Sequence, residues 1–334
     1  MNLSSKIYVA GHRGLVGSAL VRQLRALGHA NLVVRSHGEL DLTERQAVRE
    51  FFARERPEYV FLAAAKVGGI LSNSASPADF IGENLLIQTN VIHEAYRSGV
   101  ERLLFLGSSC IYPRNAPLPL KEECLLTGPL EPTNRPYAVA KIAGIEMCWS
   151  YNRQFGTRFL AAMPTNLFGP GDRYDLHDAH VVAALIRKMH AAKAAQAKEV
   201  VIWGSGTPRR EFLYSDDAAD ACLFLMNLAD EQWKPLVADG EARPLVNIGC
   251  GQDLAIRELA ELVAEVVGFK HRLIFDPSKP DGTPRKLLDI SRLTALGWQP
   301  KTSLREGLER ASRDFSENAL RTARPALAAT GSAD

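Results

Sequence analysis

The stretch Lys6-Ile7-Tyr8-Val9-Ala10-Gly11-His12-Arg13-Gly14-Leu15-Val16-Gly17 joins a short apolar run to three glycines spaced three residues apart. A helical pattern with Leu20, Leu24 and Leu27 on one face follows it, so the sequence predicts a buried strand, a glycine turn and a helix. Glycines let a backbone approach a pyrophosphate closely, and the N–H groups at the start of a helix bind the anion. Although the spacing is GxxGxxG and not the more familiar GxGxxG, residues 11 to 17 are expected to bind a dinucleotide.

The residues that follow the next apolar run indicate which dinucleotide this turn binds. NAD sites usually carry an Asp or Glu about 20 residues beyond the glycines, whereas the 2′-phosphate of NADP requires cations. Here Arg35 and His37 end the run and Arg13 lies inside the glycine turn, which favours NADP(H). Glu39 and Asp41 lie close enough to be the acid of an NAD site. The alternative for Arg35 and His37 is that they are solvated loop residues.

Apolar runs and helical patterns alternate along the first half of the chain. Runs typical of buried strands occupy residues 31–35, 59–65 and 103–107, and a long helical pattern spans about 77–98. This alternation predicts parallel βαβ units and therefore an α/β fold with a doubly wound parallel sheet. Ligands of such sheets bind beyond the carboxyl ends of the strands, where Ser108 and Cys110 are expected. Serines after a strand are also ordinary turn chemistry, and Cys110 could be a small buried hydrophobe.

A tyrosine and a lysine follow a turn-rich run in the middle of the chain. Pro136 suits the first turn of a helix, so Tyr137 and Lys141 are expected on one helical face, four residues apart. A phenol with a pKa of about 10 is a poor proton donor near neutrality, but a neighbouring ammonium favours the phenolate. The pair is therefore predicted to perform acid–base chemistry, although Tyr and Lys at this spacing are often only a surface pair.

The composition is that of an ordinary globular protein, with 46% hydrophobic and 23% charged residues and a net charge of +2 in 334 residues. No basic run with interleaved aromatics is present, so no nucleic acid partner is expected. No apolar stretch reaches the roughly 18 to 20 residues of a membrane helix, and no signal-peptide segment begins the chain, so a cytoplasmic protein is expected. Five cysteines lie scattered without CxxC spacing, which predicts free thiols.

Together, the glycine turn, the Ser108 strand end and the Tyr137-x-x-x-Lys141 pattern resemble the extended short-chain dehydrogenase/reductase family of nucleotide-sugar enzymes. The resemblance is greatest to the group that converts GDP-4-keto-6-deoxy-D-mannose to GDP-L-fucose by 3,5-epimerisation and NADPH-dependent 4-reduction. It covers about residues 6 to 318. The stretches that carry it, in order, are residues 11–19, 63–70, 106–113, 163–167 and 279–286.

The resemblance implies five catalytic residues around the keto sugar. Tyr137 would donate the proton in the 4-keto reduction, Lys141 would bind the nicotinamide ribose and lower the tyrosine pKa, and Ser108 would hydrogen-bond the substrate oxygen. Cys110 and His180 would move the protons at C3 and C5, and their ordinary pKa values of about 8.5 and 6.5 bracket neutrality. No metal is expected, because the spacing of the cluster around His180 fits no standard site. That cluster also contains Asp172, Asp175, His177 and Asp178.

The resemblance also implies the residues that contact the two ligands. The expected NADP(H)-binding residues are Gly11, His12, Arg13, Gly14, Leu15, Val16, Gly17, Arg35, His37, Asp41, Leu42, Leu106, Gly107, Lys141, Pro164, Asn166, Leu167 and His180. The expected substrate-binding residues are Ser108, Asn166, Lys188, Trp203, Arg210, Asp281 and Lys286. Lys188 and His37 stand where the family generally has arginine, which is expected to weaken the contacts with the diphosphate and the 2′-phosphate. Solvated surface cations are the alternative for Arg210 and Lys286.

Family likeness divides the chain into parts. Residues 1–165 are expected to form mainly a Rossmann NADP-binding domain, and residues 166–320 mainly a smaller α/β substrate-binding domain with some segments returning to the sheet. Strands are expected near residues 200–203 and 246–249, a helix and an exposed connection at 187–199, and a flexible tail at 321–334. The helices at about 77–98 and 137–153 are expected to form the bundle of a homodimer.

Two rival functions remain at this point. An NAD-dependent 4-epimerase or 4,6-dehydratase of the same fold is one, but such a dehydratase generally has Thr-Asp-Glu where this chain has Ser108-Ser109-Cys110. A simple 4-epimerase needs no Cys–His pair. A non-catalytic NADP-binding module is the other, and it predicts neither Tyr-x-x-x-Lys nor an anion pocket.

Overall fold

The computed structural model describes residues 1–175, 179–238, 240, 242–279 and 281–323. Its larger part is built on six parallel strands in the order β2-β1-β3-β4-β5-β9. In sheet order these are β2 (Leu32–Val33), β1 (Ile7–Ala10), β3 (Tyr59–Leu62), β4 (Arg102–Leu106), β5 (Phe159–Pro164) and β9 (Leu245–Ile248). The chain order reverses direction beside β1, which makes the sheet doubly wound and confirms the predicted fold class.

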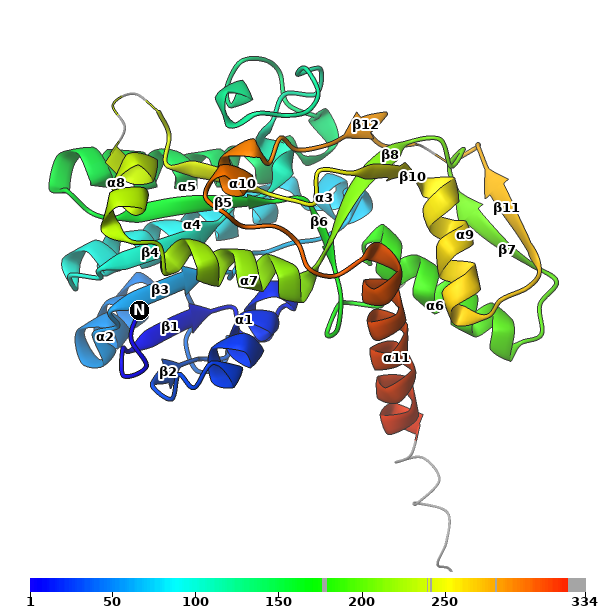
Figure 1. Cartoon of the computed structure of the whole chain (residues 1–334), viewed down its shortest axis with the longest axis horizontal. Helices are drawn as coiled ribbons and strands as arrows, with labels where there is room; N and C mark the ends of the chain where they lie inside the picture. Colours follow the sequence, from blue (N-terminus) through cyan, green and yellow to red (C-terminus); the bar gives the residue numbers. More distant parts are fainter. Residues whose placement is uncertain (176–178, 239, 241, 280, 324–334) are drawn as a thin grey trace, which may run out of the picture.

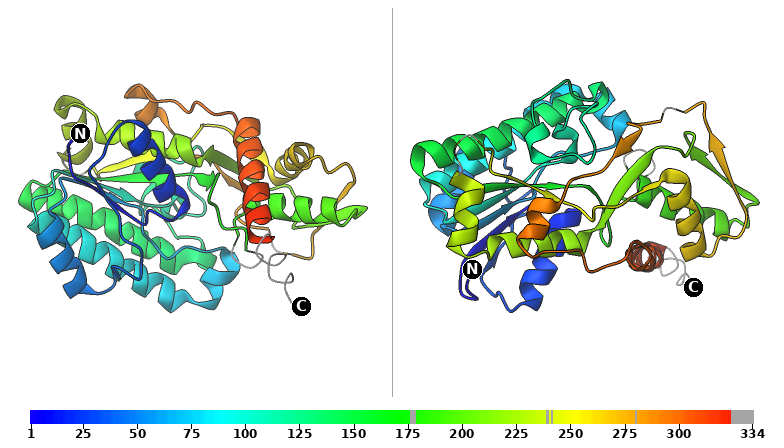
Figure 2. Two further views of the ribbon diagram at one scale, coloured as in Figure 1. Left: turned by 90° about the horizontal axis from the view of Figure 1, so that it is seen from below. Right: turned by 45° about the horizontal axis from the view of Figure 1, so that its top comes forward.

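Helices cover both faces of this sheet because its strands alternate their apolar side chains (Figure 2). Ile7 and Val9 pack into a core with the helices of one face, whereas Tyr8 and Ala10 pack into the core of the other. The first face carries α1 (Leu15–Ala26), α7 (Ser215–Met226) and α8 (Asp230–Ala238). The second carries α2 (Arg45–Glu55), α4 (Pro77–Arg97) and α5 (Arg135–Phe155).

A smaller domain stands beside the carboxyl edge of the large sheet (Figure 1). It has its own apolar core between short strands and three helices. Its strands are β6 (Asn166–Phe168), β7 (Glu199–Trp203), β8 (Arg209–Tyr214), β10 (Asp253–Ala255), β11 (Arg272–Asp276) and β12 (Arg285–Lys286). Its helices are α6 (Val181–Ala194), α9 (Ile256–Val267) and α11 (Leu304–Ala323), while the short α3 (Ile70–Ala75) and α10 (Ser291–Ala295) lie in connections.

The predicted elements differ from the observed ones mainly at their ends. The second strand was expected over residues 31–35 but pairs with β1 only at Leu32 and Val33, at the edge of the sheet. The third was expected to reach residue 65, but the chain leaves the sheet after Leu62. The helix expected to begin at residue 187 begins at Val181. Of the strands of the smaller domain, only β7 was predicted, whereas β6, β8, β10, β11 and β12 were not.

Three further expectations can be compared with the fold. All five cysteines carry free thiols. Within the described part of the chain, no helix combines the length and the apolar character that crossing a bilayer requires. Most of the predicted tail, residues 324–334, lies outside the described residues.

Candidate active site

The glycine turn between β1 and α1 leaves its backbone open to a ligand. A Cβ on Gly11, whose φ is +83°, would lie 2.6 Å from the backbone nitrogen of Ala64. A Cβ on Gly17 would lie 2.1 Å from the carbonyl oxygen of Gly11, so only glycine lets α1 begin this close to the turn. No side chain caps α1 at Gly14. The bare backbone and the positive end of the helix fit the pyrophosphate of a dinucleotide.

The cations predicted for the 2′-phosphate are arranged unequally. Arg35 forms an ion pair with Glu55 of α2, with 2.7 Å between guanidinium nitrogen and carboxylate oxygen. Arg13 is exposed, and the His37 side chain is 83% exposed, 3.8 Å from Asp41. Arg13 and His37 are therefore the accessible members of the predicted set, and Arg35 would have to share its guanidinium with Glu55.

Glu39 and Asp41, the two acids that could serve an NAD site, accept hydrogen bonds from neighbouring residues. The Glu39 carboxylate accepts hydrogen bonds from the backbone nitrogen and the hydroxyl of Ser36, at 2.7 and 2.6 Å. The Asp41 carboxylate accepts from the backbone nitrogen and the hydroxyl of Thr43, at 2.9 and 2.7 Å. These turn contacts occupy both carboxylates locally, which favours a site for NADP over one for NAD.

Helix α5 carries the predicted tyrosine and lysine on one face. Pro136 lies in its first turn, as expected, and Tyr137 and Lys141 follow one turn apart. Lys141 is 3% exposed, and its Nζ donates a hydrogen bond to the carbonyl oxygen of Leu106 at 2.8 Å. The same Nζ lies 5.8 Å from the centre of the Tyr137 ring. The pair therefore faces the carboxyl end of β4.

Burial dominates the electrostatics of this pair. It lowers the pKa of Lys141 to about 8, because the charged ammonium is removed from water. Burial, followed by the Cys110 thiol, raises the pKa of Tyr137, and a hydrogen bond with Ser108 opposes the rise. The Ser108 hydroxyl is the group that opposes this rise, and the lowering of the tyrosine pKa expected from Lys141 stays a prediction.

Ser108 connects the phenol to the cysteine. It follows β4 and precedes a short 3-10 turn, Ser109–Ile111, where its Oγ accepts a hydrogen bond from the backbone nitrogen of Cys110 at 3.5 Å. Cys110 is 6% exposed. Burial raises the pKa of its thiol, while Lys286, the Ser108 hydroxyl and Lys141 act in the opposite direction. Tyr137, Ser108 and Cys110 thus form one group at the end of β4.

His180 lies apart from this group in its contacts. It is exposed at the residue before α6. Burial raises the pKa of Asp172, and His180 opposes that rise. Among the described residues no hydrogen bond joins His180 to Cys110, so their cooperation stays a prediction. The neighbouring His177 and Asp178 lie outside the described residues, and the remaining part of the chain holds no group of three potential metal ligands.

Lys286, one of the predicted substrate cations, faces the cysteine, and Arg210 lies beside it. Arg210 on β8 lies opposite Lys286 on β12 in the parallel pairing of these strands. Burial lowers the pKa of both residues, and in the case of Lys286 the Cys110 side chain opposes the change. Neither side chain forms an ion pair within 4 Å of a carboxylate in the described structure. Unneutralised, partly buried cations of this kind fit a phosphate-bearing ligand better than the surface alternative.

An exposed aromatic ring lies beside further cations of the smaller domain. Trp203 is 55% exposed at the end of β7. The ammonium groups of Lys188 and Lys279 lie 5.3 and 5.7 Å from its ring centre. Arg187, which could replace the expected arginine at position 188, instead donates to a backbone carbonyl. Lys188 therefore supplies the charge beside this ring, without the two-pronged geometry of an arginine.

The other predicted contact residues lie near the same edge. Asn166 donates to the backbone carbonyl of Glu211 at 2.9 Å, and Asp281 accepts from the hydroxyl of Ser205 at 2.6 Å. Both side chains are thus held within the protein, and their contacts with a nucleotide sugar stay predictions. The remaining predicted cofactor residues are Leu42, which is buried, Leu106 and Gly107 at the end of β4, Pro164 at the end of β5 and Leu167 in β6.

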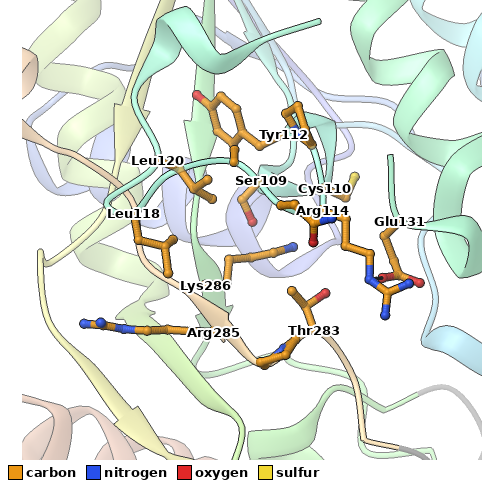
Figure 3. Close-up of a pocket in the computed structure, with 14 residues that line it drawn as sticks. Ser109, Cys110, Tyr112, Arg114, Leu118, Leu120, Glu131, Thr283, Arg285 and Lys286 are labelled. Carbon is orange, nitrogen blue, oxygen red and sulfur yellow. Dashed lines mark ion pairs between the residues drawn. The ribbon is translucent and has the colours of Figure 1, made fainter. Parts of the chain in front are cut away.

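A cavity of about 190 Å³ opens beside Cys110 (Figure 3). Lys286 lines it, and an ion pair between Arg114 and Glu131, with 3.4 Å between nitrogen and oxygen, closes one side. Thr283 lines it as well. The volume is below the 300 Å³ or more typical of drug-sized pockets, so it suits a small polar unit such as a sugar.

Sequence reasoning did not find all the residues of this site. Arg114, Glu131 and Thr283 line the cavity, yet no motif singles them out. Phe80 on α4 packs edge-on against Tyr137, with ring centres 6.2 Å apart, and its position gave no signal because apolar residues recur throughout that helix. Glu131 begins the turn-rich run before Tyr137, which was the nearest available indication.

A doubly wound sheet with a glycine turn, and a half-buried tyrosine beside a buried lysine at its carboxyl edge, defines a dinucleotide-dependent oxidoreductase. Residues 7–239 match the model of the NAD dependent epimerase/dehydratase family. The chain belongs to this family.

Individual relatives narrow the comparison. GDP-L-fucose synthase 1 of Arabidopsis thaliana is 58% identical over 305 residues, covering 91% of each chain. The GDP-L-fucose synthase of Escherichia coli is 53% identical over 317 residues, covering 94% of this chain and 97% of that one. The structure of a GDP-mannoheptose C4 reductase from Campylobacter jejuni with NADP bound matches with a TM-score of 0.86 and 42% identity, over 95% and 99% of the two chains.

Replacing Lys141 by Met tests the electrostatic cost of the site. The lysine pKa falls from 10.5 to about 8 on folding, and each unit is worth about 1.4 kcal/mol, against about 1 kcal/mol for the lost hydrogen bond. We therefore expect Lys141→Met to be about 2–3 kcal/mol more stable at pH 7 in urea unfolding, although inactive as a reductase.

The pH dependence of the unfolding free energy shows whether the buried Lys141 charge destabilises the protein. The unfolded chain binds the lysine proton more tightly than the folded chain does. The destabilisation by Lys141 is therefore complete below pH 8 and decreases as the pH rises toward 10.5. Wild-type stability should gain on that of Lys141→Met across this range. Parallel pH profiles for the two proteins would contradict the assignment.

Proposed function

We propose that this enzyme is a GDP-L-fucose synthase, which converts GDP-4-keto-6-deoxy-D-mannose to GDP-L-fucose by 3,5-epimerisation followed by NADPH-dependent reduction at C4. The observation that carries the proposal is the cluster of Tyr137, Ser108 and Cys110 at the end of β4. The Ser108 hydroxyl contacts both the Tyr137 phenol and the backbone of Cys110. Relatives of that name are 53% and 58% identical over nearly the whole chain.

Epimerisation uses the acidity of protons beside a ketone. Inverting C3 and C5 requires a proton to leave one face of the sugar and another to arrive on the opposite face, so two acid–base groups have to flank the ring. Cys110 is one of these groups, since it lines the cavity beside Lys286. His180 is the other, and it approaches the sugar from the start of α6.

Reduction uses the residues at the start of α5. The cofactor is NADP(H), which supplies the hydride for C4 when bound against the glycine turn. Tyr137 donates the proton to the carbonyl oxygen, and Ser108 hydrogen-bonds that oxygen beforehand. Lys141 holds the nicotinamide ribose and supports the phenolate that remains after the transfer.

The nucleotide part of the substrate is bound by the smaller domain. Arg210 and Lys286 hold the diphosphate with charge-assisted hydrogen bonds, and Lys188 contributes a further charge. Trp203 offers an exposed ring against which the guanine stacks. Asn166 and Asp281 bind polar groups after exchanging their present backbone and hydroxyl partners.

A second candidate function is C4 reduction without epimerisation. The similarity to a GDP-mannoheptose C4 reductase and the separate contacts of His180 favour it. The two functions differ in whether Cys110 exchanges protons with the sugar.

We also propose a cytoplasmic homodimer formed through α4 and α5. Free thiols at all five cysteines suit a reducing compartment. On the two helices, Leu86, Val139 and Phe155 are 50%, 40% and 43% exposed, and Phe155 stacks on Tyr96 across the helix pair with ring centres 4.2 Å apart. A second copy of the same surface would bury these apolar groups.

The function is tested by incubating the protein with GDP-4-keto-6-deoxy-D-mannose and either reduced cofactor. We expect GDP-L-fucose as the product, identified by NMR, with kcat/KM for NADPH at least about tenfold above that for NADH, or roughly 1.4 kcal/mol. A 4-reduced sugar of unchanged C3 and C5 configuration would select the second candidate function. A preference for NADH would overturn the assignment of Arg13 and His37.

Two substitutions separate the half-reactions. Cys110→Ser should suppress wash-in of solvent deuterium at C3 and C5 by about 100-fold or more, with NADPH affinity unchanged. Tyr137→Phe should slow the reduction by a similar factor and leave the wash-in largely intact. Cys124→Ser serves as the matched control, because this thiol lies outside the cavity. Unaltered exchange in Cys110→Ser would remove the thiol from the mechanism.

The dimer is tested by combining Leu86→Glu with Phe155→Glu. Placing carboxylates in the proposed apolar interface should yield monomers in sedimentation velocity, because buried unpaired charges are costly. Leu27→Glu, at a residue 56% exposed at the end of α1, is the control that should leave the mass unchanged. A wild-type protein that sediments as a monomer would refute the proposal.

A further inference from the structure

Four cations occupy two neighbouring strands in matching register. The parallel pairing of β8 and β12 sets Arg209 opposite Arg285 and Arg210 opposite Lys286. Successive side chains of a strand point to opposite faces, so the first pair lies on one face and the second pair on the other. Figure 3 shows this alternation, with Lys286 extended toward Cys110 and Arg285 extended away from it.

Carboxylates neutralise the face that carries Arg209 and Arg285: Glu258 lies 3.5 Å from Arg209, and Asp253 contacts both arginines. Asp253 lies on β10, which pairs with β8 on the opposite side from β12, and its side chain is 4% exposed. Its Oδ1 accepts from Arg209 Nε at 2.9 Å, and its Oδ2 accepts from Arg285 Nε. Burial alone would raise the pKa of Asp253, but the bonds from Arg285 and Arg209 hold it below its ordinary value. Three strands are thereby joined through one side chain.

On the face of Arg210 and Lys286, no carboxylate of the described residues lies within ion-pair distance, although Glu131 raises the pKa of Lys286 and Asp281 that of Arg210 from further away. Burial is the largest cause of the lowered Lys286 pKa, and the positive charge of Arg210 lowers it further. Lys286 also acts on the Cys110 thiol. This face therefore keeps its two positive charges for a ligand, whereas the other face has its charges matched.

The strand that carries Lys286 is short and depends on its anchors. β12 comprises only Arg285 and Lys286. On one side of the lysine the Arg285 guanidinium is held by Asp253, and on the other side the backbone nitrogen of Leu288 donates to the buried Glu211 carboxylate at 3.0 Å. A two-residue strand has few backbone bonds of its own, so these carboxylates hold it in register.

We propose that Asp253 is a positioning residue for substrate binding: by clamping Arg209 and Arg285 on one face of the strands, it directs Arg210 and Lys286 to the other face, beside the cavity, as a preformed site for a diphosphate. This inference rests on the proposed function for the identity of the ligand. Asp253 acts through its partners and does not touch the substrate. A preformed pair of cations saves the entropy of ordering two long side chains when the anion binds.

The test compares Asp253→Asn with the wild type in the NADPH-dependent reaction. The amide keeps the size of the side chain but removes the charge that holds both arginines. We expect the KM for GDP-4-keto-6-deoxy-D-mannose to rise about tenfold, the Kd for GDP to rise by a similar factor, and kcat to stay within about twofold. The Kd for NADPH should not change, because the glycine turn belongs to the other domain.

Asp220→Asn is the matched control. Asp220 also binds two partners, accepting from Trp298 Nε1 at 2.8 Å and from Lys301 Nζ at 2.9 Å, but it lies on α7 outside the cavity. Its substitution should leave the KM unchanged. Arg285→Met breaks the contact between residues 253 and 285 while keeping the Asp253 carboxylate. This substitution should also raise the KM for the sugar nucleotide.

A double substitution separates positioning from loss of stability. If Asp253 acts through Lys286, then Asp253→Asn should add little to the KM effect of Lys286→Met, since the two changes disrupt one unit. Additive effects, or a fall in kcat and NADPH affinity that follows the loss of thermal stability, would overturn the proposal. An unchanged KM in an active Asp253→Asn variant would do so as well. A wild type that fails to convert the sugar would instead refute the proposed function.

Discussion

The hydrogen bond from the buried Lys141 ammonium to the Leu106 carbonyl is the contact on which the site depends. It fastens the first turns of α5 to the carboxyl end of β4, and these elements carry the tyrosine, the serine and the cysteine. The lysine lies over the Phe105 ring, with 4.8 Å between Nζ and the ring centre. Its ammonium donates a hydrogen bond to the Leu106 carbonyl. Such a group is expensive to bury, so the fold accepts lower stability in exchange for a cation beside Tyr137.

The second half of the site depends on strands that meet far from this bond. β8 leads from the smaller domain toward α7, which packs on the large sheet against α1. Glu211 on β8 is fully buried and accepts hydrogen bonds from the backbone of Cys250, Gly251 and Leu288. It thereby joins the loop after β9 to the segment after β12. Arg210 and Lys286, the proposed substrate cations, are thus connected to the large sheet through backbone contacts.

The sequence predicted the parts of the structure that local physics determines. The glycine turn could be predicted because Gly11 and Gly17 stand where the fold leaves no room for a Cβ. The shared face of Tyr137 and Lys141 could be predicted because the two residues are four positions apart on a helix. Arg35 was read as a phosphate ligand, but Glu55, 20 residues further on, pairs with it, and no local pattern announces that contact. The pairing of β12 with β8 joins segments far apart in the chain, so neither Asp253 nor the opposite faces of Arg285 and Lys286 could be foreseen.

The clustering of phenol, hydroxyl and thiol explains how one crevice serves two reactions. A ketone acidifies the protons on its neighbouring carbons only while its oxygen can accept negative charge, and the same oxygen accepts charge when C4 is reduced. In the proposed mechanism Tyr137 and Ser108 therefore stabilise the oxygen in both steps, while Cys110, held beside them, is needed for the first alone. Reduction removes the carbonyl and with it the acidity at C3 and C5. Epimerisation consequently has to precede hydride transfer, and an enzyme that holds both sets of groups around one carbonyl needs no second site.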